Sequence, residues 1–263
     1  MLIKDLPLIV DQISNIQKIS KRKSCVYFCL FGPYDAIEPP KFIEKDFDYF
    51  ILTDQDLALK HFNIIKVDTK GSNRRANRYF KINPHLFFKP YSTSIYLDSN
   101  VIIHGSLKLL QEVDCCADLI IFQHNKRNCV YDEINECIKW KRDSTRILRQ
   151  HRKTLRREGI KKKSGLLLGS ILVRRHNNLV SFSSTWWSKY AAGSSRDQIS
   201  LIQALNVHSP NIFILPFGNF QKYFTRKSHK QKDITERNLN FYEKTQLVII
   251  QKLFEIYKWI KAL

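Results

Sequence analysis

The stretch Arg74–Asn100, RRANRYFKINPHLFFKPYSTSIYLDSN, decides the fold class of this chain and the position of its site. Basic side chains recur in it at steps of four, three and four: Arg74, Arg78, Lys81 and His85. This spacing stacks side chains on one face of a helix. We therefore expect a helix from about residue 72 to 85 that breaks near Pro84.

This helix is followed by a short apolar, β-prone run, Ser94–Leu97, which leads directly into Asp98. Ligands of α/β sheets bind outside the carboxyl ends of the strands. A cationic helix face beside a carboxylate at a strand end therefore predicts a site for a nucleoside diphosphate and a divalent metal ion. The alternative interpretation is a solvent-exposed helix face followed by an ordinary turn.

The composition indicates a globular chain that attracts polyanions. Its 263 residues are 43% hydrophobic, enough for a packed core, and its formal net charge is +20. Such a charge favours nucleic acid, an anionic membrane surface or phosphate-bearing substrates as partners. Residues 139–163 concentrate the charge, with twelve Lys or Arg and two acidic residues.

The apolar runs and the cysteines of the sequence bear on the cellular compartment of the protein. No apolar run reaches the roughly 20 residues of a membrane span, and the N-terminal residues lack the apolar core of a secretory signal. The six cysteines form neither a CxxC pair nor a zinc-binding spacing. We expect a cytoplasmic protein that associates peripherally with the inner face of the cytoplasmic membrane.

Apolar β-prone runs alternate with helical patterns along the chain, which predicts an α/β fold with a mainly parallel central sheet flanked by helices. We expect one domain over residues 1–220, with a basic helical insertion at about 134–163. A basic C-terminal extension follows at 221–263, with a long helix at 235–263. The section from 132 to 157 also reads as helical.

The ends of the first two predicted strands carry a candidate nucleoside-binding loop. It combines aromatic side chains for stacking, a glycine and an acid for hydroxyl or ring N–H groups: Phe31, Gly32, Tyr34 and Asp54. The alternative is a pair of ordinary turns at strand ends.

The helix and the strand quoted above supply candidate groups for a diphosphate. Arg75, Arg78 and Lys81 are the candidate cations, and Asp98 with Asn100 is the candidate metal pair. Oxygen ligands suit Mg²⁺ and Mn²⁺. The amide of Asn100 brings no charge, so the pattern leaves metal dependence open.

Two later segments carry further candidate catalytic groups. In the first, His124, Arg127 and Glu133 follow a predicted strand, where Arg127 would neutralise phosphate and Glu133 would orient a sugar hydroxyl or Arg127. In the second, Asp197 and Gln198 begin a predicted helix. Acids at a helix N-terminus are also ordinary partners of the helix dipole, which is the alternative for both segments.

Five motifs together carry a family resemblance: YFCLFGPYD (27–35), YLDSN (96–100), HNKRNCVYDE (124–133), GSILVRRHN (169–177) and SSRDQIS (194–200). In order and spacing, the chain resembles the glycosyltransferase-like domain of bacterial surface-polysaccharide clusters and of plant cell-wall and mucilage proteins, over roughly residues 25 to 205. The resemblance implies a GT-A-like (Rossmann-like) catalytic domain that binds a nucleotide-sugar. It also implies Asp98 near the diphosphate, with Asp197 and Gln198 beside the reaction centre.

We therefore expect a glycosyltransferase that moves a sugar from a nucleotide-diphosphate-sugar to a hydroxyl of a surface glycan, such as lipopolysaccharide or capsule. A UDP-sugar is the favoured donor, and Mn²⁺ or Mg²⁺ is the candidate metal. The expected partners are this donor, a glycan or lipid-linked glycan acceptor and an anionic membrane surface, with no specific nucleic acid. Asp197 would be the general base of an inverting enzyme or a nucleophile or stabiliser in a retaining one.

Two other classes remain open at this stage. The charge of +20 favours a nucleic-acid-binding protein, although no helix-turn-helix, zinc-finger or RNA-binding sheet motif is present. A lipid or glycan hydrolase would use His124 or Asp197 with water, although no Gly-x-Ser-x-Gly elbow is present.

Overall fold

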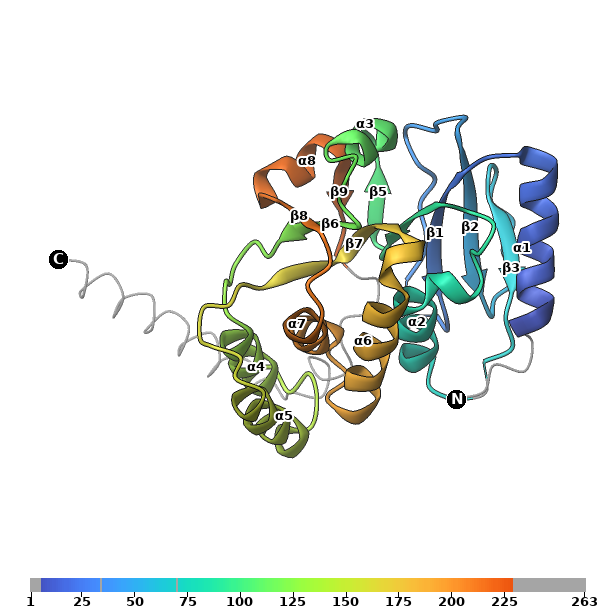
Figure 1. Ribbon diagram of the computed structural model, residues 1–263. Coiled ribbons are helices and arrows are strands. Elements are labelled where there is room, and N and C mark those ends of the chain that lie inside the picture. The colour runs from blue at the N-terminus through green and yellow to red at the C-terminus, as the bar shows by residue number, and fades with distance from the viewer. Residues whose placement is uncertain (1–5, 34, 70, 229–263) are drawn as a thin grey trace.

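A seven-stranded sheet forms the centre of the computed structural model, which describes residues 6–33, 35–69 and 71–228 (Figure 1). The strand order is β3-β2-β1-β4-β7-β6-β8. The strands are β1 (Ser24–Leu30), β2 (Phe47–Thr53), β3 (Asn63–Lys66), β4 (Thr93–Leu97), β6 (Leu119–Gln123), β7 (Leu167–Arg175) and β8 (Ile212–Leu215).

The direction of the strands agrees with the expected α/β class. All neighbouring pairs of this sheet are parallel except the two that involve β7, which runs antiparallel to β4 and to β6. Because β7 is reversed, its first residues lie at the edge where β1 and β4 end. This edge of the sheet therefore contains the last residues of β1 and β4 and the first residues of β7. The candidate site lies here.

The two central strands explain why the sheet forms here. Every residue of β1 (SCVYFCL) and β2 (FDYFILT) is buried. Continuous apolar runs of this kind are typical of parallel strands that are covered on both faces. Full pairing also satisfies their backbone N–H and C=O groups away from water.

Helices and a small second sheet cover the two faces of the central sheet. One core contains residues of α1 (Leu6–Ser20), α2 (Asn73–Ile82), α6 (Val180–Ala192) and α7 (Asp197–Val207). The other core contains residues of α3 (Leu107–Glu112), α8 (Phe220–Tyr223) and a two-stranded sheet of β5 (Val101–Ile103) and β9 (Phe224–Arg226). In Figure 1 the second group lies above the central sheet, and α2, α6 and α7 lie below it.

The helix predicted from the basic spacing is α2, and it is shorter than expected. Ser72 begins it, because its hydroxyl accepts the backbone N–H of Arg75, and it ends at Ile82 just before Pro84. His85 therefore lies in a separate 3₁₀ turn (Pro84–Leu86) and not on the helical face. Burial, followed by the charge of Arg174, lowers the pKa of His85 to about 4.

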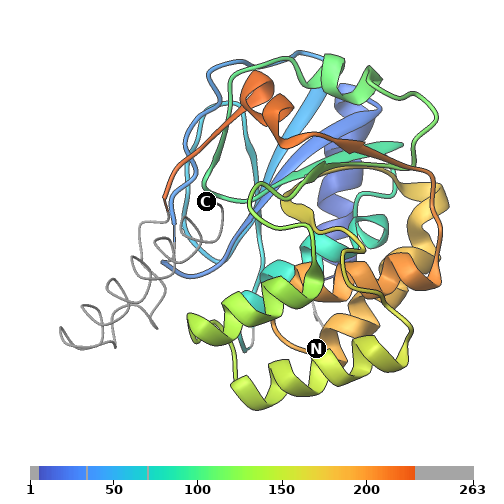
Figure 2. The ribbon, with the colours of Figure 1, turned by 90° about the vertical axis from the view of Figure 1, so that its left-hand side faces the viewer.

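The basic section predicted as helical consists of two helices. These are α4 (Val130–Lys139) and α5 (Thr145–Arg157), which lie side by side in the lower part of Figure 2. Lys141, with φ of +49°, lies in the turn between them. α5 buries Leu148, His151 and Leu155 and turns its basic side chains outward.

Within the described ranges, no helix has the length and apolar character needed to cross a membrane. The predicted helix at 235–263 lies outside the described residues. Part of the predicted C-terminal extension is described: β9 pairs with β5, with Arg226 opposite Val101.

Candidate functional site

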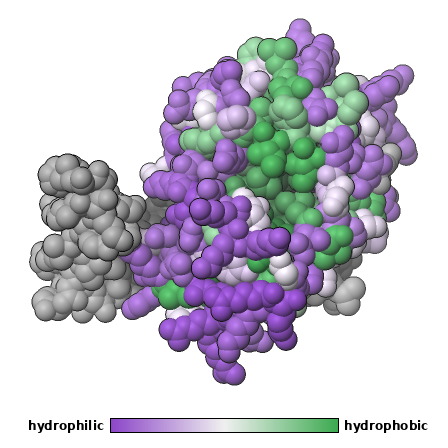
Figure 3. Space-filling view, turned by 60° about the vertical axis from the view of Figure 1, so that its left-hand side comes forward, coloured by the Kyte–Doolittle hydropathy of each residue, from purple (hydrophilic) through white to green (hydrophobic). Residues whose placement is uncertain are grey.

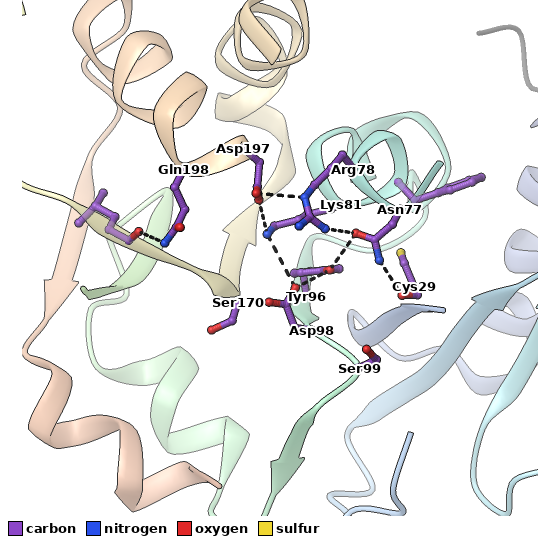
Figure 4. A network of polar contacts seen from close by, with 12 residues as sticks. Cys29, Asn77, Arg78, Lys81, Tyr96, Asp98, Ser99, Ser170, Asp197 and Gln198 are labelled. Atoms are coloured by element: carbon purple, nitrogen blue, oxygen red, sulfur yellow. Dashed lines mark hydrogen bonds and ion pairs between the residues drawn. The ribbon is translucent and has the colours of Figure 1, made fainter. Parts of the chain in front are cut away.

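The candidate site lies where β4 ends and β7 begins. The backbone N–H of Asp98, the first residue after β4, donates to the carbonyl oxygen of Ser170 at 2.9 Å. α2 lies over the same edge through its contacts with β1. The predicted strand end and the predicted basic helix are therefore neighbours in space, as Figure 4 shows.

Asp197, the first residue of α7, forms ion pairs with two cations of α2 (Figure 4). Its Oδ2 lies 2.5 Å from Lys81 Nζ, and its Oδ1 lies 3.0 Å from Arg78 Nε. The Lys81 side chain is 2% exposed and the Asp197 side chain 5% exposed. One buried carboxylate thus contacts two cations that lie 116 and 119 residues earlier in the sequence.

The surroundings of Asp197 decide its protonation state. Burial would raise the pKa of its carboxyl, but the charges of Arg78 and Lys81 outweigh burial and hold that pKa well below its usual range. Asp197 is therefore an anion at every physiological pH. A carboxylate with so low a pKa is also a weak proton acceptor.

Asp98 shares the cation of Asp197. Lys81 Nζ lies 3.8 Å from Asp98 Oδ1, and the Tyr96 hydroxyl donates to the same oxygen at 2.8 Å. The ammonium also lies over the Tyr96 ring, 5.1 Å from its centroid. Tyr96 and Asp98 are two residues apart, a spacing at which strand side chains face the same way.

Asn77 ties the site to β1. Its Nδ2 donates to the carbonyl of Cys29 at 2.7 Å, and its Oδ1 accepts from Arg78 Nη1 at 2.5 Å. These bonds fix the orientation of the Arg78 guanidinium that faces Asp197.

Gly169 of β7 allows these charges to approach the sheet. A Cβ at this position would lie 3.1 Å from Lys81 Nζ and 3.4 Å from Asp197 Oδ2. Gln198 lies beside it and donates through Nε2 to the carbonyl of Leu167 at 3.1 Å. The absent side chain thus leaves the room that the ion pair occupies.

Arg226 reaches the same edge from β9. The residue as a whole is exposed, but its guanidinium donates to the Ser170 hydroxyl and lies over the Phe220 ring. Ser170 is therefore shared, because its carbonyl accepts from Asp98 and its hydroxyl from Arg226. A third cation thus borders the end of β4.

The predicted metal pair does not have the surroundings that a divalent cation needs. Asn100 is buried, and its Nδ2 donates to the backbone carbonyl of Lys227 at 2.7 Å. Asp98 already faces the ammonium of Lys81. Over residues 6–33, 35–69 and 71–228, no three His, Cys, Asp or Glu side chains gather as metal ligands do.

The predicted nucleoside loop lies at the ends of β1 and β2. Both carboxylate oxygens of Asp54 accept the backbone N–H of Gly32, at 2.9 and 3.1 Å. Gly32 has φ of +68°, and a Cβ there would lie 2.2 Å from Asn73 Nδ2, so this turn requires glycine. The Phe31 ring is buried and stacked on Phe80, so it belongs to the core. Tyr34 lies outside the described residues.

Arg75 does not join Arg78 and Lys81. Its guanidinium lies over the Trp187 ring of α6, 5.3 Å from the centroid. Arg74 does reach the loop before α7, where its Nη1 donates to the Ser195 hydroxyl at 3.1 Å.

The residues after β6 form a separate recess of about 330 Å³ lined by Gln123, His124, Lys126, Arg127, Asn128 and Asp132. His124 Nδ1 accepts the backbone N–H groups of Lys126 and Arg127, each at 3.1 Å. Burial and the Arg127 charge lower the pKa of His124 to about 4, so the ring is neutral at pH 7.

Glu133 links this recess to the ion-pair cluster. It is 1% exposed, and its Oε2 lies 2.5 Å from Arg127 Nη2. Its other oxygen lies 3.6 Å from Arg196, the residue before Asp197. In this structure Glu133 holds two arginines in position.

Sequence reasoning missed Tyr96, Asn77, Ser170, Arg226 and the buried Arg174. Arg174 Nη1 donates to the carbonyl of Lys81 at 2.7 Å, and its Nη2 donates to the Tyr27 hydroxyl. A cation at the carboxyl end of a helix is favourable, so Arg174 anchors the end of α2 that carries Lys81. Tyr96 could have been found from its two-residue spacing to Asp98.

Comparisons with known proteins bear on the family. No curated protein matches the chain. One solved structure that resembles it is described as the apo structure of a bifunctional WbbM glycosyltransferase, with 11% identity and a TM-score of 0.47. That match covers 74% of this chain and 39% of the WbbM chain. Residues 10–229 match the model of the TOD1/MUCI70 glycosyltransferase-like domain, and because the match spans most of the chain, the protein belongs to this family.

Proposed function

We propose that this protein transfers a sugar from a nucleotide-diphosphate-sugar, with a UDP-sugar as the favoured donor, to a hydroxyl of a surface glycan. The observation that carries the proposal is the cluster of Arg78, Lys81, Asp98 and Asp197 at the carboxyl ends of the parallel strands. This edge is where α/β sheets bind nucleotides. Membership of a glycosyltransferase-like family agrees with it.

The reaction needs stabilisation of a leaving anion. The bond between the anomeric carbon and the diphosphate oxygen breaks, and a bond from that carbon to the acceptor oxygen forms. The acceptor proton leaves to a base or to the departing phosphate. Negative charge develops on the diphosphate, and fixed cations such as Arg78 and Lys81 stabilise such charge without reorganisation.

The environment of Asp197 supports one of its two possible roles. A strong ion pair and a very low pKa make it a poor general base. As a permanent anion it is suited to stabilise a positively charged anomeric carbon, and to hold Lys81 and Arg78 in position. Gln198, which lies next to it, would contact the same sugar.

The recess after β6 is the candidate acceptor site. His124 and Arg127 line it, and Glu133 connects it through Arg196 to Asp197. A glycan or lipid-linked glycan with a phosphate would be attracted by Arg127. Loss of His124 would then weaken acceptor use without weakening donor binding.

A cationic surface supports the proposal that the acceptor is presented by an anionic membrane. Along residues 139–163, both acids turn inward: Asp143 accepts from the Ser195 backbone and Glu158 pairs with Lys189. Ten cations of this section are exposed: Lys139, Lys141, Arg146, Arg149, Lys153, Arg156, Arg157, Lys161, Lys162 and Lys163. Figure 3 shows a broad hydrophilic surface in the lower part of this side of the molecule.

A donor screen followed by a transfer assay tests the function. Thermal unfolding is measured with UDP, GDP, CMP and their sugar conjugates, because a ligand of the native state raises Tm by mass action. The nucleotide that raises Tm is then supplied as its sugar conjugate with glycan acceptors, and release of the nucleotide is followed. We expect release that requires an acceptor, and a loss of about 100-fold or more in Asp197→Asn.

Three results would contradict the proposal. If no nucleotide raised Tm, the proposed donor site would be contradicted. Product formed from glycan or lipid without a nucleotide donor would favour a hydrolase. Tight binding of nonspecific DNA or RNA at physiological salt, without nucleotide binding, would favour a nucleic-acid-binding protein.

A further inference from the structure

The end of β4 is surrounded by cations of the chain itself. Lys81 Nζ lies 2.5 Å from Asp197 and 3.8 Å from Asp98, so one ammonium serves both carboxylates. Arg78 pairs with Asp197 from the same helix, and Arg226 reaches Ser170, whose backbone bonds to Asp98. Among these five side chains, three cations face two carboxylates, and a further carboxylate, that of Asp35, accepts from the Ser99 hydroxyl at 2.8 Å.

A divalent ion would find few suitable ligands in this cluster. Magnesium and manganese require several oxygen ligands, with carboxylates as the strongest. Asp98 is already paired with Lys81, and the Asn100 amide is fixed on the Lys227 carbonyl. A metal ion bound to Asp98 would also be repelled by the nearby ammonium.

We propose that the leaving diphosphate of the donor is bound without a metal ion, with Arg226 as its principal ligand and Lys81 as the cation that neutralises Asp98. This inference rests on the proposed function and extends it to the way in which the diphosphate is held. A guanidinium has five N–H donors in a planar fork, and the bond to Ser170 uses one of them. The others match a phosphate in geometry and charge.

The anchoring of Arg226 explains how one exposed arginine can act as a fixed ligand. The β5–β9 pairing sets its backbone opposite Val101, and the Ser170 hydroxyl and the Phe220 ring hold its guanidinium. A side chain held at three points loses little further freedom when a phosphate binds. The cation is therefore positioned before the donor arrives.

The test measures the Kd of UDP and of GDP by calorimetry, once with excess EDTA and once with Mn²⁺ or Mg²⁺. We expect equal affinity with and without metal for the nucleotide that binds. Arg226→Met should weaken binding by about 10- to 100-fold, as expected for loss of charge-assisted hydrogen bonds. Lys222→Met, which removes an exposed cation four residues earlier, is the matched control and should leave Kd unchanged.

The outcomes separate this inference from the proposed function. Nucleotide binding that appears with Mn²⁺ and is lost in EDTA would keep the function and overturn the inference. Metal-free binding that is equally strong in Arg226→Met and in the parent would overturn the role of Arg226. No binding of any nucleotide under either condition would overturn the function itself. Because Arg226 is exposed, its substitution leaves the core intact, and unfolding followed by circular dichroism verifies this.

Discussion

At the scale of single residues, the site depends on one buried lysine between two carboxylates. Lys81 is 2% exposed and cannot exchange its partners for water. Removing one partner of a buried ion pair typically costs about 3 to 5 kcal/mol, because the other charge stays buried. We therefore expect a substitution that removes one partner of the Lys81–Asp197 pair to destabilise the folded chain.

The depressed pKa of Asp197 predicts how stability depends on pH. Its pKa is lower in the folded chain than in the unfolded chain, so the unfolded state binds the proton more readily. The stability that Asp197 contributes is complete above the unfolded pKa, which is about 4, and is lost as the pH falls below it. We expect Tm to fall between pH 5 and about 3, and to fall less steeply in Asp197→Asn.

The control for this experiment is Asp56→Asn. The pKa of Asp56 is also lowered, by its hydrogen bond with Lys66, but the Asp56 side chain is fully exposed and that of Lys66 is half exposed. Exposed pairs contribute little to stability, so this variant should follow the parent curve. If Asp197→Asn also followed the parent curve, the ion pairs of Asp197 would not be formed in solution.

At the scale of elements, α5 holds the loop that presents Asp197. His151 Nδ1 accepts the backbone N–H of Ser194 at 3.1 Å, so its Nε2 carries the proton and donates to Gln203. Burial lowers the pKa of His151, which keeps the ring neutral. The basic helical section is therefore a structural support of α7 as well as a charged surface.

Contact between His151 and Gly193 gives a prediction for this support. A Cβ on Gly193 would lie 2.5 Å from His151 Cε1, and the ring is fixed at both nitrogens. We expect Gly193→Ala to cost about 1 to 3 kcal/mol and to lower Tm by about 3 to 10 °C. Gly218→Ala is the control, since nothing lies within 4 Å of its Cβ, and differential scanning calorimetry compares the two. Equal Tm values would show that the ring moves aside freely.

Local patterns predicted the elements better than the site. The strands, α2 and the strand-end position of Asp98 follow from apolar runs and from helical spacing, which depend on neighbouring residues. The break at Pro84 follows from its ring, but the exclusion of His85 from the helical face depends on where the helix ends.

Long-range contacts were beyond such patterns. Asp197 was recognised as a candidate, but its pairing with Lys81 joins segments 116 residues apart. Arg226 is brought to the site by the β5–β9 pairing, and Arg174 acts from within a strand. The residues next to Arg226 and Arg174 in the sequence do not distinguish these two arginines from the many others of this basic chain.

At the scale of the whole molecule, the charge is distributed unevenly. The exposed cations of α5 recur at Arg149, Lys153 and Arg156, a spacing that lines one face of the helix. An anionic bilayer attracts such a face by about 1 kcal/mol for each Lys or Arg. α1 lies at the opposite end of the view in Figure 1 and provides a comparison surface.

A vesicle experiment tests whether the α5 face is the membrane-binding surface. We expect binding to vesicles of phosphatidylglycerol and phosphatidylcholine that weakens with salt. Changing Arg149, Lys153 and Arg156 together to Gln should weaken it by about 100-fold. Changing the exposed Lys18, Lys23 and Lys60 to Gln removes the same charge from another region and should have a small effect. Equal losses in the two variants would mean that net charge alone drives binding.

The pairing of β9 with β5 has a consequence for the order in which the site forms during synthesis. Arg226 follows the rest of the described site along the chain, so a ribosome completes the site only after nearly all of the described residues have been made. Contacts so distant in sequence form slowly compared with local ones. A nascent or shortened chain that ends after β8 would contain all seven strands of the central sheet but would lack Arg226, together with the core residues Phe220 and Phe224. During synthesis, the capacity to hold a donor would therefore be acquired last.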